Sequence, residues 1–525
     1  MGDSKSFRLR RALISVTDKD RVVDLARGLT ALGVEVVSTG GTKALLQREG
    51  VAARDVAEVT GSPEMLDGRV KTLHPKIHGG ILARRDLAKH AAELEAQQIQ
   101  PIDLVAVNLY AFEDAAGRAG AAFEEVIEEI DIGGPTLLRA AAKNHAGVIV
   151  LVDPEDYAWV LARLGEGRDL DAAERQGLAL KVFQHTARYD AAIASWLAAR
   201  SPGAAAQELP AVLTIAASKE QALRYGENPH QKGAVYRDLI RPPASLVGAQ
   251  QLGGKELSYN NLLDADAALG LAIDLGGTTA VFVKHNNPCG VARRPTLADA
   301  IKTARAADEV SAFGAVVALT QAVDAQSAEI LGETFLEVIV APGFSEEAIE
   351  ILGRKKNLRL LSLGALGGPD QGFEIRRVRG GWLAQDRDTR APAEQELRAA
   401  KLATARAPSD AERAGLIFTW TVAKHVRSNA IVFGHADRTV AVGAGQMSRV
   451  DSVAICKLKA GDALKGTVVA SDAFFPFRDG VDLLAAAGAT SIAQPGGSVR
   501  DGEVIAAANE HGVAMVLTGV RHFRH

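Results

Sequence analysis

The chain has 525 residues, of which 47% are hydrophobic and 24% are charged. Such a length exceeds one ordinary hydrophobic core, so we expect roughly two to four globular domains. Basic and acidic residues number 60 and 64, and the formal net charge of −4 excludes a general nucleic-acid-binding surface while leaving room for local phosphate pockets.

Cysteine content and the amino terminus restrict the cellular setting. Only Cys289 and Cys456 are present, which excludes a disulfide scaffold, fits a reducing cytoplasm and leaves no thiolate-rich metal site. No apolar run has the length of a membrane span, and the opening MGDSKSFRLRR lacks the apolar core of a signal peptide. We therefore expect a cytoplasmic protein that binds neither membranes nor nucleic acid.

Strands and helices alternate along the first half of the chain. The helix after the first strand is expected to take Thr17 or Asp18 as its N-cap and to stop at Gly33. Strands are expected at residues 11–16, 34–38, 104–110 and 147–153, and mostly helical structure at residues 171–199. This alternation predicts an α/β fold with a parallel sheet, which binds ligands at the carboxyl ends of its strands.

A Pro-, Gly- and Ala-rich stretch at residues 199–212 separates the two halves. We assign residues 1–200 to a first domain, 201–222 to a linker and 223–525 to a second domain. Roughly 300 residues are many for one core, so the second domain is expected to form two lobes that divide near residues 385–400. No internal repeat is clear from the sequence.

The segment STGGT (38–42) follows a predicted strand and opens a predicted helix. Its two glycines let backbone N–H groups approach a phosphate, and a helix N-terminus supplies partial positive charge. Hydroxyl donors come from Ser38, Thr39 and Thr42, and Lys19 in the preceding segment SVTDK could reach the same anion. Many strand–turn–helix junctions carry glycines for geometry alone, so this is a candidate phosphate site.

The segment GRVKTLHPKIHGG (68–80) has little to pack and is predicted to be a loop. His74 and His78 have the spacing of a metal-binding pair, but Pro75 lies between them and no acidic ligand is near. A structural hydrogen-bonding role is therefore favoured over metal binding. The side chains that precede them are better suited to contacts with anions and carbonyl groups: Arg69, Lys71 and Thr72.

The segment IDIGGPTLLRAAAKNHAG (130–147) places Asp131 and two glycines before a predicted helix that ends near Lys143. A carboxylate, bare backbone donors and a lysine suit a reaction that moves protons while an oxyanion forms. The alternative for Lys143 is a cation that stabilises a helix C-terminus. Tyr110, at the end of a predicted strand, is either an interface aromatic or a proton donor.

The segment VFVKHNNPCG (281–290) joins an apolar strand to a polar cluster, and Pro288 and Gly290 are expected to force a turn. His285 titrates near neutral pH and can accept a proton, whereas Lys284 is better suited to stabilise an oxyanion or to protonate a leaving nitrogen. Consecutive strand residues point to opposite faces, so both reach one site only if the strand bends at Lys284. The alternative is a solvated lysine beside a turn-capping histidine.

Together these segments resemble the purine-biosynthesis family that joins AICAR formyltransferase to IMP cyclohydrolase (AICAR, aminoimidazole carboxamide ribonucleotide; IMP, inosine monophosphate). The matching strings, in the order of the family, are SVTDK, STGGT, GRVKTLHPKIHGGIL, DIGGPTLLRAAAKNH, LRYGENPHQ, KHNNPCG, APGF, SNAIVF, GAGQMSR and SDAFFPFRDG. They cover nearly the whole chain.

The resemblance implies an N-terminal methylglyoxal-synthase-like parallel-sheet domain and a C-terminal transformylase of two cytidine-deaminase-like lobes. It implies a homodimer with shared sites, with AICAR, formylated AICAR (FAICAR) and a folate as small-molecule substrates. The formyl group would pass from 10-formyltetrahydrofolate, a co-substrate, to the amino group of AICAR. FAICAR would then close to IMP with loss of water.

The resemblance also implies roles for individual residues. Ring closure would use Lys71, Tyr110, Asp131 and Lys143. Formyl transfer would use Lys284 and His285, with Asn429 orienting the formyl group or its oxyanion. The first domain would hold its nucleotide with Ser15, Lys19, Ser38, Thr39, Gly40, Gly41, Thr42, Arg69 and Thr72. The second would bind AICAR with Arg224, Tyr225, Gly314, Glu337, Arg449, Phe474 and Arg521.

Two positions depart from the family pattern, and two other functions compete with it. Arg427 stands where lysine is common, and Ala111 stands where proline often follows the tyrosine; neither change removes a proposed catalytic group. Zinc-dependent deamination would need a second cysteine after Cys289 and a glutamate two residues after His285, which are absent, so no catalytic metal is expected. Alternatively, one half could be only a nucleotide-binding regulatory module.

Overall fold

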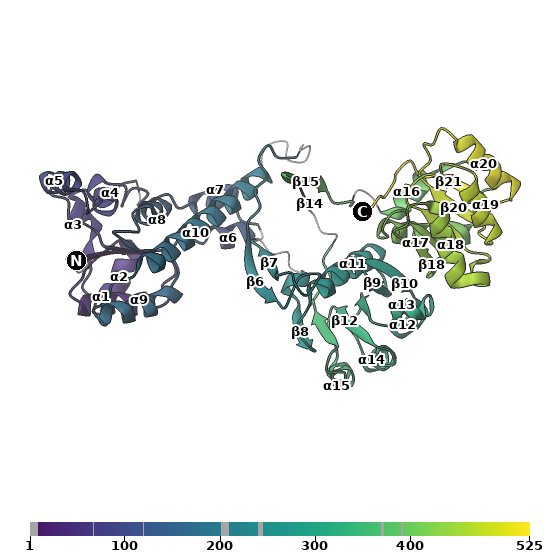
Figure 1. Cartoon of the computed structure of the whole chain (residues 1–525), viewed down its shortest axis with the longest axis horizontal. Helices are drawn as coiled ribbons and strands as arrows, with labels where there is room; N and C mark the ends of the chain where they lie inside the picture. Colours follow the sequence, from purple (N-terminus) through teal and green to yellow (C-terminus); the bar gives the residue numbers. More distant parts are fainter. Residues whose placement is uncertain are drawn as a thin grey trace. The chain divides into compact units, whose positions relative to one another are not determined.

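The computed structural model describes residues 9–66, 68–118, 120–200, 209–239, 245–368, 372–389 and 392–525. Contacts between residues divide the chain into two compact units (Figure 1). The first comprises Met1–Ser218 with Asp238–Ile240, and the second comprises Lys219–Arg237 with Arg241–His525. No helix in these described ranges is long and apolar enough to span a membrane.

The first unit is built on a five-stranded sheet in which every neighbouring pair of strands is parallel, in the order β3-β2-β1-β4-β5. The strands are β1 (Arg11–Ser15), β2 (Glu35–Ser38), β3 (Arg54–Asp55), β4 (Leu104–Val107) and β5 (Ile149–Leu151). The apolar residues of β1 and β4 are buried at its centre, as expected for a sheet covered on both faces. The predicted parallel sheet is confirmed.

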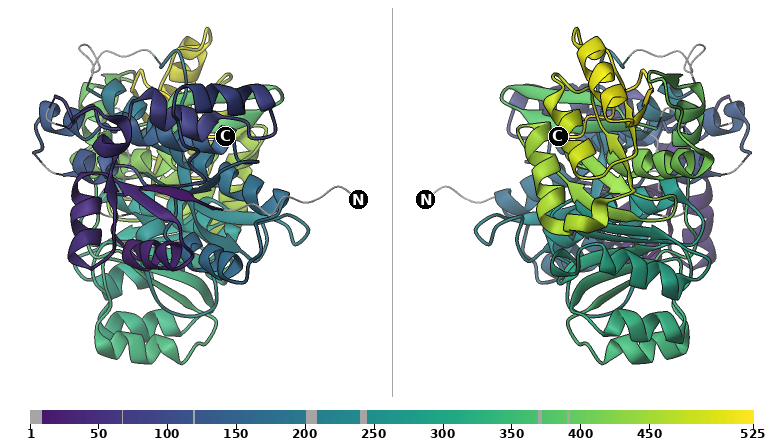
Figure 2. Two further views of the ribbon diagram at one scale, coloured as in Figure 1. Left: turned by 90° about the vertical axis from the view of Figure 1, so that its left-hand side faces the viewer. Right: turned by 90° about the vertical axis from the view of Figure 1, so that its right-hand side faces the viewer.

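Helices surround this sheet, coloured purple to blue in Figure 2 (left). They are α1 (Val22–Ala31), α2 (Gly40–Arg48), α3 (Val56–Thr60), α4 (Pro75–Leu82), α5 (Ala88–Ala96), α6 (Phe112–Gly117), α7 (Phe123–Glu128), α8 (Gly133–Lys143), α9 (Glu155–Gly165) and α10 (Ala172–Ala198). The long helix α10 begins with a capping box in which Asp171 and Glu174 each accept a backbone N–H of the other.

Helix α1 begins later than the sequence predicts. The backbone N–H groups of Thr17 and Asp18 donate to the Oδ1 atom of Asn108, at 2.5 and 2.9 Å, so these residues are tied to the end of β4. The helix starts only at Val22, after Arg21 has turned the chain with a φ of 53°. The prediction of Thr17 or Asp18 as the N-cap is therefore wrong, because a long-range hydrogen bond competes with local capping.

Part of the predicted loop over residues 68–80 is a helix. Pro75 occupies the first turn of α4, and the His74 side chain caps it by accepting the backbone N–H of Lys76 at 3.1 Å. Ile77 is fully buried. A Cβ at Gly80 would lie 2.7 Å from a backbone carbonyl oxygen, so this glycine serves close packing rather than loop flexibility. The loop prediction is wrong from residue 75 onward.

The second unit contains two six-stranded mixed sheets, one in each lobe. The first has the order β10-β9-β11-β12-β13-β8, in which β9 is antiparallel to both its neighbours and β11, β12 and β13 are parallel. Its strands are β8 (Gln250–Gly253), β9 (Thr279–Lys284), β10 (Asn287–Arg293), β11 (Ala315–Leu319), β12 (Leu336–Ala341) and β13 (Arg359–Ser362). Its helices are η2 (Leu246–Gly248), α11 (Tyr259–Leu275), α12 (Leu297–Ala306), α13 (Glu309–Ala312), α14 (Ala325–Gly332) and α15 (Glu346–Gly353).

The second sheet has the order β16-β21-β20-β19-β17-β18, and yellow-green helices surround it in Figure 2 (right). Its strands are β16 (Lys401–Leu402), β17 (Ile431–Gly434), β18 (Thr439–Gly443), β19 (Val468–Ser471), β20 (Ser491–Gln494) and β21 (Ala514–Leu517). Its helices are α16 (Ala393–Ala399), α17 (Asp410–Lys424), α18 (Arg449–Ala460), η3 (Gly461–Leu464), α19 (Asp479–Ala486) and α20 (Asp501–Glu510). Two hairpins lie outside these sheets: β6 (Ala217–Leu223) with β7 (Gly233–Asp238), of which residues 219–237 belong to this unit, and β14 (Phe373–Val378) with β15 (Gly381–Asp386).

The two lobes repeat one topology, although no internal repeat is clear in the amino-acid sequence. Each sheet has an antiparallel hairpin at one edge, three parallel strands beside it and a short antiparallel strand at the other edge. The hairpin strands β10 and β18 also meet, since Val291 donates its backbone N–H to the Thr439 hydroxyl at 2.9 Å. The second unit thus contains two similar sheets that meet at the edge strands β10 and β18.

Candidate active sites

A cavity of about 740 Å³ lies at the carboxyl ends of β1, β2 and β4 in the first unit, where a parallel sheet is expected to bind ligands. Most of the side chains predicted for this unit line it. They are Ser15, Lys19, Thr39, Gly40, Gly41, Thr42, Arg69, Lys71, Thr72, Tyr110 and Asp131.

One wall of this cavity is the N-terminal end of α2. Gly40 and Gly41 form its first turn, so their backbone N–H groups have no partner within the helix and can bind an anion. The hydroxyl groups of Ser15 and Thr39 are 3.0 Å apart, and the Lys19 ammonium donates to the Thr42 hydroxyl at 3.0 Å. Burial lowers the pKa of Lys19. The arrangement has the donors and the charge that a phosphate requires.

Lys71 reaches the same cavity beside Gly40. Its ammonium nitrogen lies 3.0 Å from a carboxylate oxygen of Glu64. A Cβ on Gly68, which has a φ of +91°, would lie 2.7 Å from this nitrogen, so the glycine makes room for the lysine. The ammonium group is half-buried and held by one carboxylate, which leaves it other donor hydrogens for a ligand.

Asp131 and the start of α8 also line this cavity. The Asp131 carboxylate accepts the backbone N–H of Gly134 at 2.8 Å, and burial raises the pKa of this carboxyl group. The backbone N–H of Asp131 donates to the hydroxyl of Tyr189 at 2.7 Å, which fixes the loop. A buried carboxyl group of raised pKa beside exposed backbone donors is suited to proton transfer.

Two residues predicted for this site lie elsewhere. Ser38 is fully buried, and its hydroxyl donates to the backbone carbonyl of Ile14 at 2.6 Å, so it supports the sheet instead of lining the cavity. Lys143 is the last residue of α8 and is exposed, whereas the first turn of α8 lines the cavity. At about 1.5 Å per residue, the two ends of this helix are roughly 15 Å apart.

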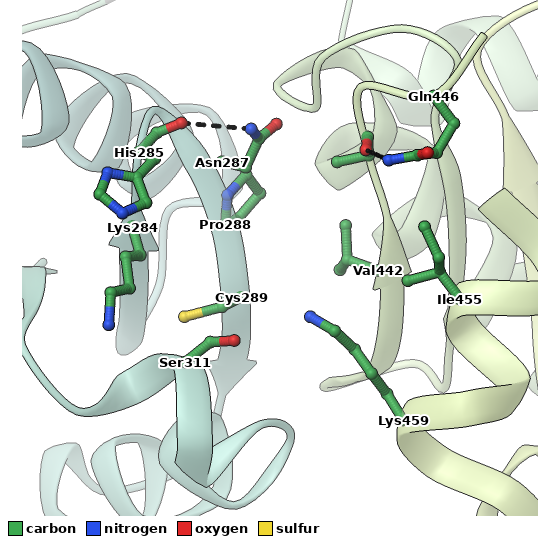
Figure 3. Close-up of a pocket in the computed structure, with 11 residues that line it drawn as sticks. Lys284, His285, Asn287, Pro288, Cys289, Ser311, Val442, Gln446, Ile455 and Lys459 are labelled. Carbon is green, nitrogen blue, oxygen red and sulfur yellow. Dashed lines mark hydrogen bonds between the residues drawn. The ribbon is translucent and has the colours of Figure 1, made fainter. Parts of the chain in front are cut away.

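A second cavity, of about 310 Å³, lies between the two lobes of the second unit (Figure 3). Lys284, His285, Asn287, Pro288, Cys289 and Ser311 line it from the first lobe. Val442, Ala444, Gln446, Ile455 and Lys459 line it from the second. Lys284 and His285 therefore line the same cavity, which is necessary if both are to act in one reaction.

The chain turns at His285 and Asn286, which have φ values of 53° and 62° and connect β9 to β10. Two central residues with positive φ are typical of a type I′ hairpin turn. The backbone N–H groups of both residues donate to the Asp264 carboxylate, at 3.3 and 2.7 Å. The prediction that Pro288 and Gly290 make the turn is wrong, because both lie within β10.

Lys284 ends β9, and its ammonium group donates to the backbone carbonyl of Phe313 at 2.6 Å. The next residue, Gly314, has a φ of +75°, and a Cβ there would lie 3.9 Å from this ammonium nitrogen. Gly314 therefore lies beside the lysine; its predicted contact with AICAR stays a prediction.

Asn429 adjoins the cavity from the second lobe. Its side-chain amide donates to the backbone carbonyl of Gln446 at 2.9 Å, and Gln446 lines the cavity. Asn287 links the two sides, because its amide oxygen accepts the backbone N–H of Arg427 at 3.0 Å. Because this hydrogen bond uses the backbone of Arg427, it does not depend on whether the side chain is arginine or lysine.

The remaining predicted nucleotide contacts fall into separate groups. Arg449 donates to the Asp472 carboxylate at 3.0 Å, and both Arg449 and Arg521 lie against the Phe523 ring. Glu337 pairs with Arg359 at 2.7 Å on the first sheet. Arg224 stacks on the ring of Tyr225 after β6, and Phe474 is partly exposed after β19.

Known proteins match this chain along nearly its full length. The family model described as "AICARFT/IMPCHase bienzyme" matches residues 141–459, and the one described as "MGS-like domain" matches residues 21–136. The bifunctional purine biosynthesis protein PurH of Myxococcus xanthus (strain DK1622) is 53% identical over 521 residues, which are 98% of this chain and 100% of that protein. The chain belongs to the AICARFT/IMPCHase bienzyme family.

This membership confirms the resemblance inferred from the motifs and the α/β fold with an MGS-like first domain. A solved structure titled "Crystal structure of ForH" is 38% identical to this chain and matches with a TM-score of 0.35 over 37% of this chain and 98% of its own.

Several residues at the bienzyme sites are absent from the sequence-based prediction. Asn108 and Glu64 hold groups in the first cavity, and Asp264 holds the hairpin turn in the second. Lys459 lines the second cavity and pairs with Asp308 of the first lobe at 2.7 Å. The partners of Asn108, Asp264 and Lys459 are distant in the chain, so local patterns contain no signal for these three residues.

Proposed function

We propose that the first unit closes the purine ring and that the second transfers the formyl group, each in its own cavity. Membership in the bienzyme family gives the chain both activities, AICAR formyltransferase and IMP cyclohydrolase, and a folate as co-substrate. The assignment of one activity to each unit rests on one observation. Lys284 and His285 line one cavity, whereas Lys71 and Asp131 line the other.

In the second unit, the amino group of AICAR attacks the formyl carbon of 10-formyltetrahydrofolate. A carbon–nitrogen bond forms to AICAR while the bond to the folate nitrogen breaks. His285 takes the proton lost by the amine, and Lys284 delivers a proton toward the departing nitrogen. Asn429 orients the formyl group. Proton transfer of this kind typically contributes ~10²–10⁴-fold to the rate.

In the first unit, the carboxamide nitrogen of FAICAR attacks the formyl carbon of the same molecule, and water leaves. The effective concentration is built into the substrate and reaches ~10⁵ M or more for aligned groups. The N-terminal end of α2 binds the phosphate, Lys71 stabilises the oxyanion, and Asp131 and Tyr110 move protons. No reacting group in either step is a metal ligand in this proposal.

Reciprocal variants test the division. Lys284→Ala is expected to remove formyl transfer and to leave the closure of supplied FAICAR unchanged, whereas Lys71→Ala is expected to do the reverse. Each variant is the folding control for the other. Near-normal formyl transfer by Lys284→Ala would show that the assignment of Lys284 is wrong.

A wild-type chain that binds nucleotide in the first cavity without closing FAICAR would instead favour the regulatory-module alternative. We further propose a cytoplasmic homodimer with shared sites, which sedimentation of the purified chain can test. The proposed domain ranges remain 1–200, 201–222 and 223–525.

A further inference from the structure

His522 is a buried histidine in the last residues of the chain, which follow β21 without a helix or strand. Its side chain is 3% exposed. The Nδ1 atom lies 2.5 Å from a carboxylate oxygen of Asp388, and the Nε2 atom lies 2.9 Å from one of Glu396. Ionised carboxylates only accept hydrogen bonds, so both ring nitrogens donate and the ring is an imidazolium.

The groups around the His522 ring stabilise a positive charge. Glu396 lies on α16 and is 6% exposed, and the oxygen that faces His522 also accepts the Trp420 indole N–H at 2.8 Å. Its second carboxylate oxygen is buried without a hydrogen-bond partner in the described part of the chain. Without His522, Glu396 would be a buried anion with one neutral donor, which is costly.

The residues around His522 contact the predicted nucleotide-binding groups. The backbone N–H of His522 donates to the carbonyl of Asp472 at 3.0 Å, and the Asp472 carboxylate accepts Arg449 at 3.0 Å and the Ser428 hydroxyl at 2.5 Å. Arg524 exchanges two hydrogen bonds with Ser428, which directly precedes Asn429 in the chain.

The ring of Phe523 also contacts two of the predicted nucleotide-binding residues, Arg449 and Arg521. The guanidinium carbons of Arg521 and Arg449 lie 4.8 and 5.9 Å from its centroid, so one aromatic ring bears on two cations. Because Phe523 follows His522 directly, its position depends on the anchored histidine.

We propose that His522 is a positioning residue of the formyltransferase: anchored between Asp388 and Glu396, it holds residues 521–525 so that Arg449 and Arg521 are preset for the nucleotide. This inference rests on the proposed function of the second unit. Burial would lower the pKa of His522, but the hydrogen bonds to Asp388 and Glu396 outweigh it and raise this pKa to about 9. Besides His522, Lys424 at the end of α17 is a positive charge that acts on Asp388, whereas the neighbouring His425 is neutral.

The first test compares His522→Leu with His511→Leu in the full chain. His511 also pairs with a carboxylate, that of Asp482 at 2.8 Å, but it is 39% exposed and lies on α20's C-terminal end. We expect His522→Leu to raise the KM for AICAR at least tenfold at pH 7 while kcat changes less than threefold. His511→Leu should change neither, and ring closure should stay within twofold in both. A wild-type KM in His522→Leu would overturn the proposal.

Two further variants separate positioning from folding. The double variant His522→Leu/Glu396→Gln removes the stranded anion, so its melting temperature should recover while its KM stays raised; recovery of both would overturn the proposal. If His522→Leu does not fold, Asp388→Asn serves instead, since the Asp388 side chain is 47% exposed. A KM raised at least threefold is expected, and an unchanged KM would overturn the proposal.

The pH dependence gives a readout that a merely structural role would not move. The wild-type KM should rise as His522 loses its proton, so the ratio of variant to wild-type KM should fall from at least tenfold at pH 7 toward one at pH 10. Independently of any substrate, nitrogen-15 spectra of the histidine rings should show both His522 nitrogens protonated at pH 7. A neutral His522 would overturn the proposal, whereas failure of the wild-type chain to use AICAR would refute only the proposed function.

Discussion

His285 carries its imidazole on a backbone conformation that residues other than glycine seldom adopt. Its φ of 53° and that of 62° at Asn286 make the hairpin turn. The Asp264 carboxylate holds both N–H groups of this turn, and burial raises the pKa of Asp264. The position of the proposed base therefore depends on a carboxylate of α11.

We expect Asp264→Ala to reduce formyl transfer because it frees the turn that carries His285. Misplacement by ~1 Å can cost about 10²-fold in rate, so the kcat of transfer should fall ~10–10²-fold. Steady-state kinetics with saturating substrates measures this change, and FAICAR closure by the same preparation is the control. An unchanged kcat of formyl transfer would mean that the turn keeps its conformation without Asp264.

Gly134 is a second residue whose size matters. An added Cβ would lie 2.4 Å from the Asp131 carboxylate and 2.7 Å from Leu109. We expect Gly134→Ala to displace Asp131 and to lower ring closure by about tenfold or more, while formyl transfer is unaffected. Gly177→Ala in α10 is the matched control, since nothing lies within 4 Å of a Cβ there. Equal closure rates in the two variants would contradict the prediction.

Local sequence predicted the groups that lie close together in the chain. The strings STGGT and KHNNPCG place their donors within a few residues of a strand end, so the strand–turn connection alone brings them to a cavity. Ser38 and Lys143 do not line the cavity, since neither a local string nor a resemblance shows which way a side chain points. Asp264 and Asn108 were missed because they support those groups from other elements.

At the scale of elements, periodicity predicted the parallel sheet of the first unit, but the ends of its helices depend on distant contacts. The start of α1 is set by Asn108, and α4 packs against residue 100 through Gly80. The family resemblance implied two similar lobes in the second unit, but local patterns did not give their strand order, because it depends on pairings between segments with no shared sequence pattern.

Helices α11 and α17 are tied together by a buried charge. The Asp274 carboxylate accepts the Lys424 ammonium and the His425 Nε2–H, both at 2.8 Å. The Nδ1 atom of His425 accepts from Arg524 at 3.3 Å, so His425 is neutral, in agreement with a pKa lowered by burial. Burial alone would raise the pKa of Asp274, but the bonds from His425 and Lys424 lower it to about 2.

This lowered pKa predicts acid sensitivity of the second unit. A carboxyl group with a depressed pKa stabilises the fold above its unfolded value near 4, and the contribution is lost as the pH falls toward 2. Asp274→Asn should therefore cost about 2 kcal/mol at pH 6 and almost nothing near pH 2. Melting of the variant and the wild type across this range measures the difference, and a constant gap would contradict the assignment.

At the scale of the whole molecule, the first unit has a hydrophobic core of its own. The buried residues of this core run from Ala12 to Trp196, so the proposed first domain contains all of them. We expect residues 1–200, expressed alone, to fold and to close FAICAR at a rate within about threefold of the full chain, since every group lining the cavity lies in this range. Loss of closure by the folded fragment would show that the second half completes the site.

The matching strand order of the two lobes is what a tandem copy of one ancestral segment would produce. Immediately after copying, both hairpins would have been equivalent. In the present chain the first hairpin keeps the lysine and the imidazole, while the second lobe supplies the facing wall. The first lobe thus holds the proposed proton-transfer groups, and the second supplies the facing wall together with Asn429, which places different selective demands on two halves of one topology.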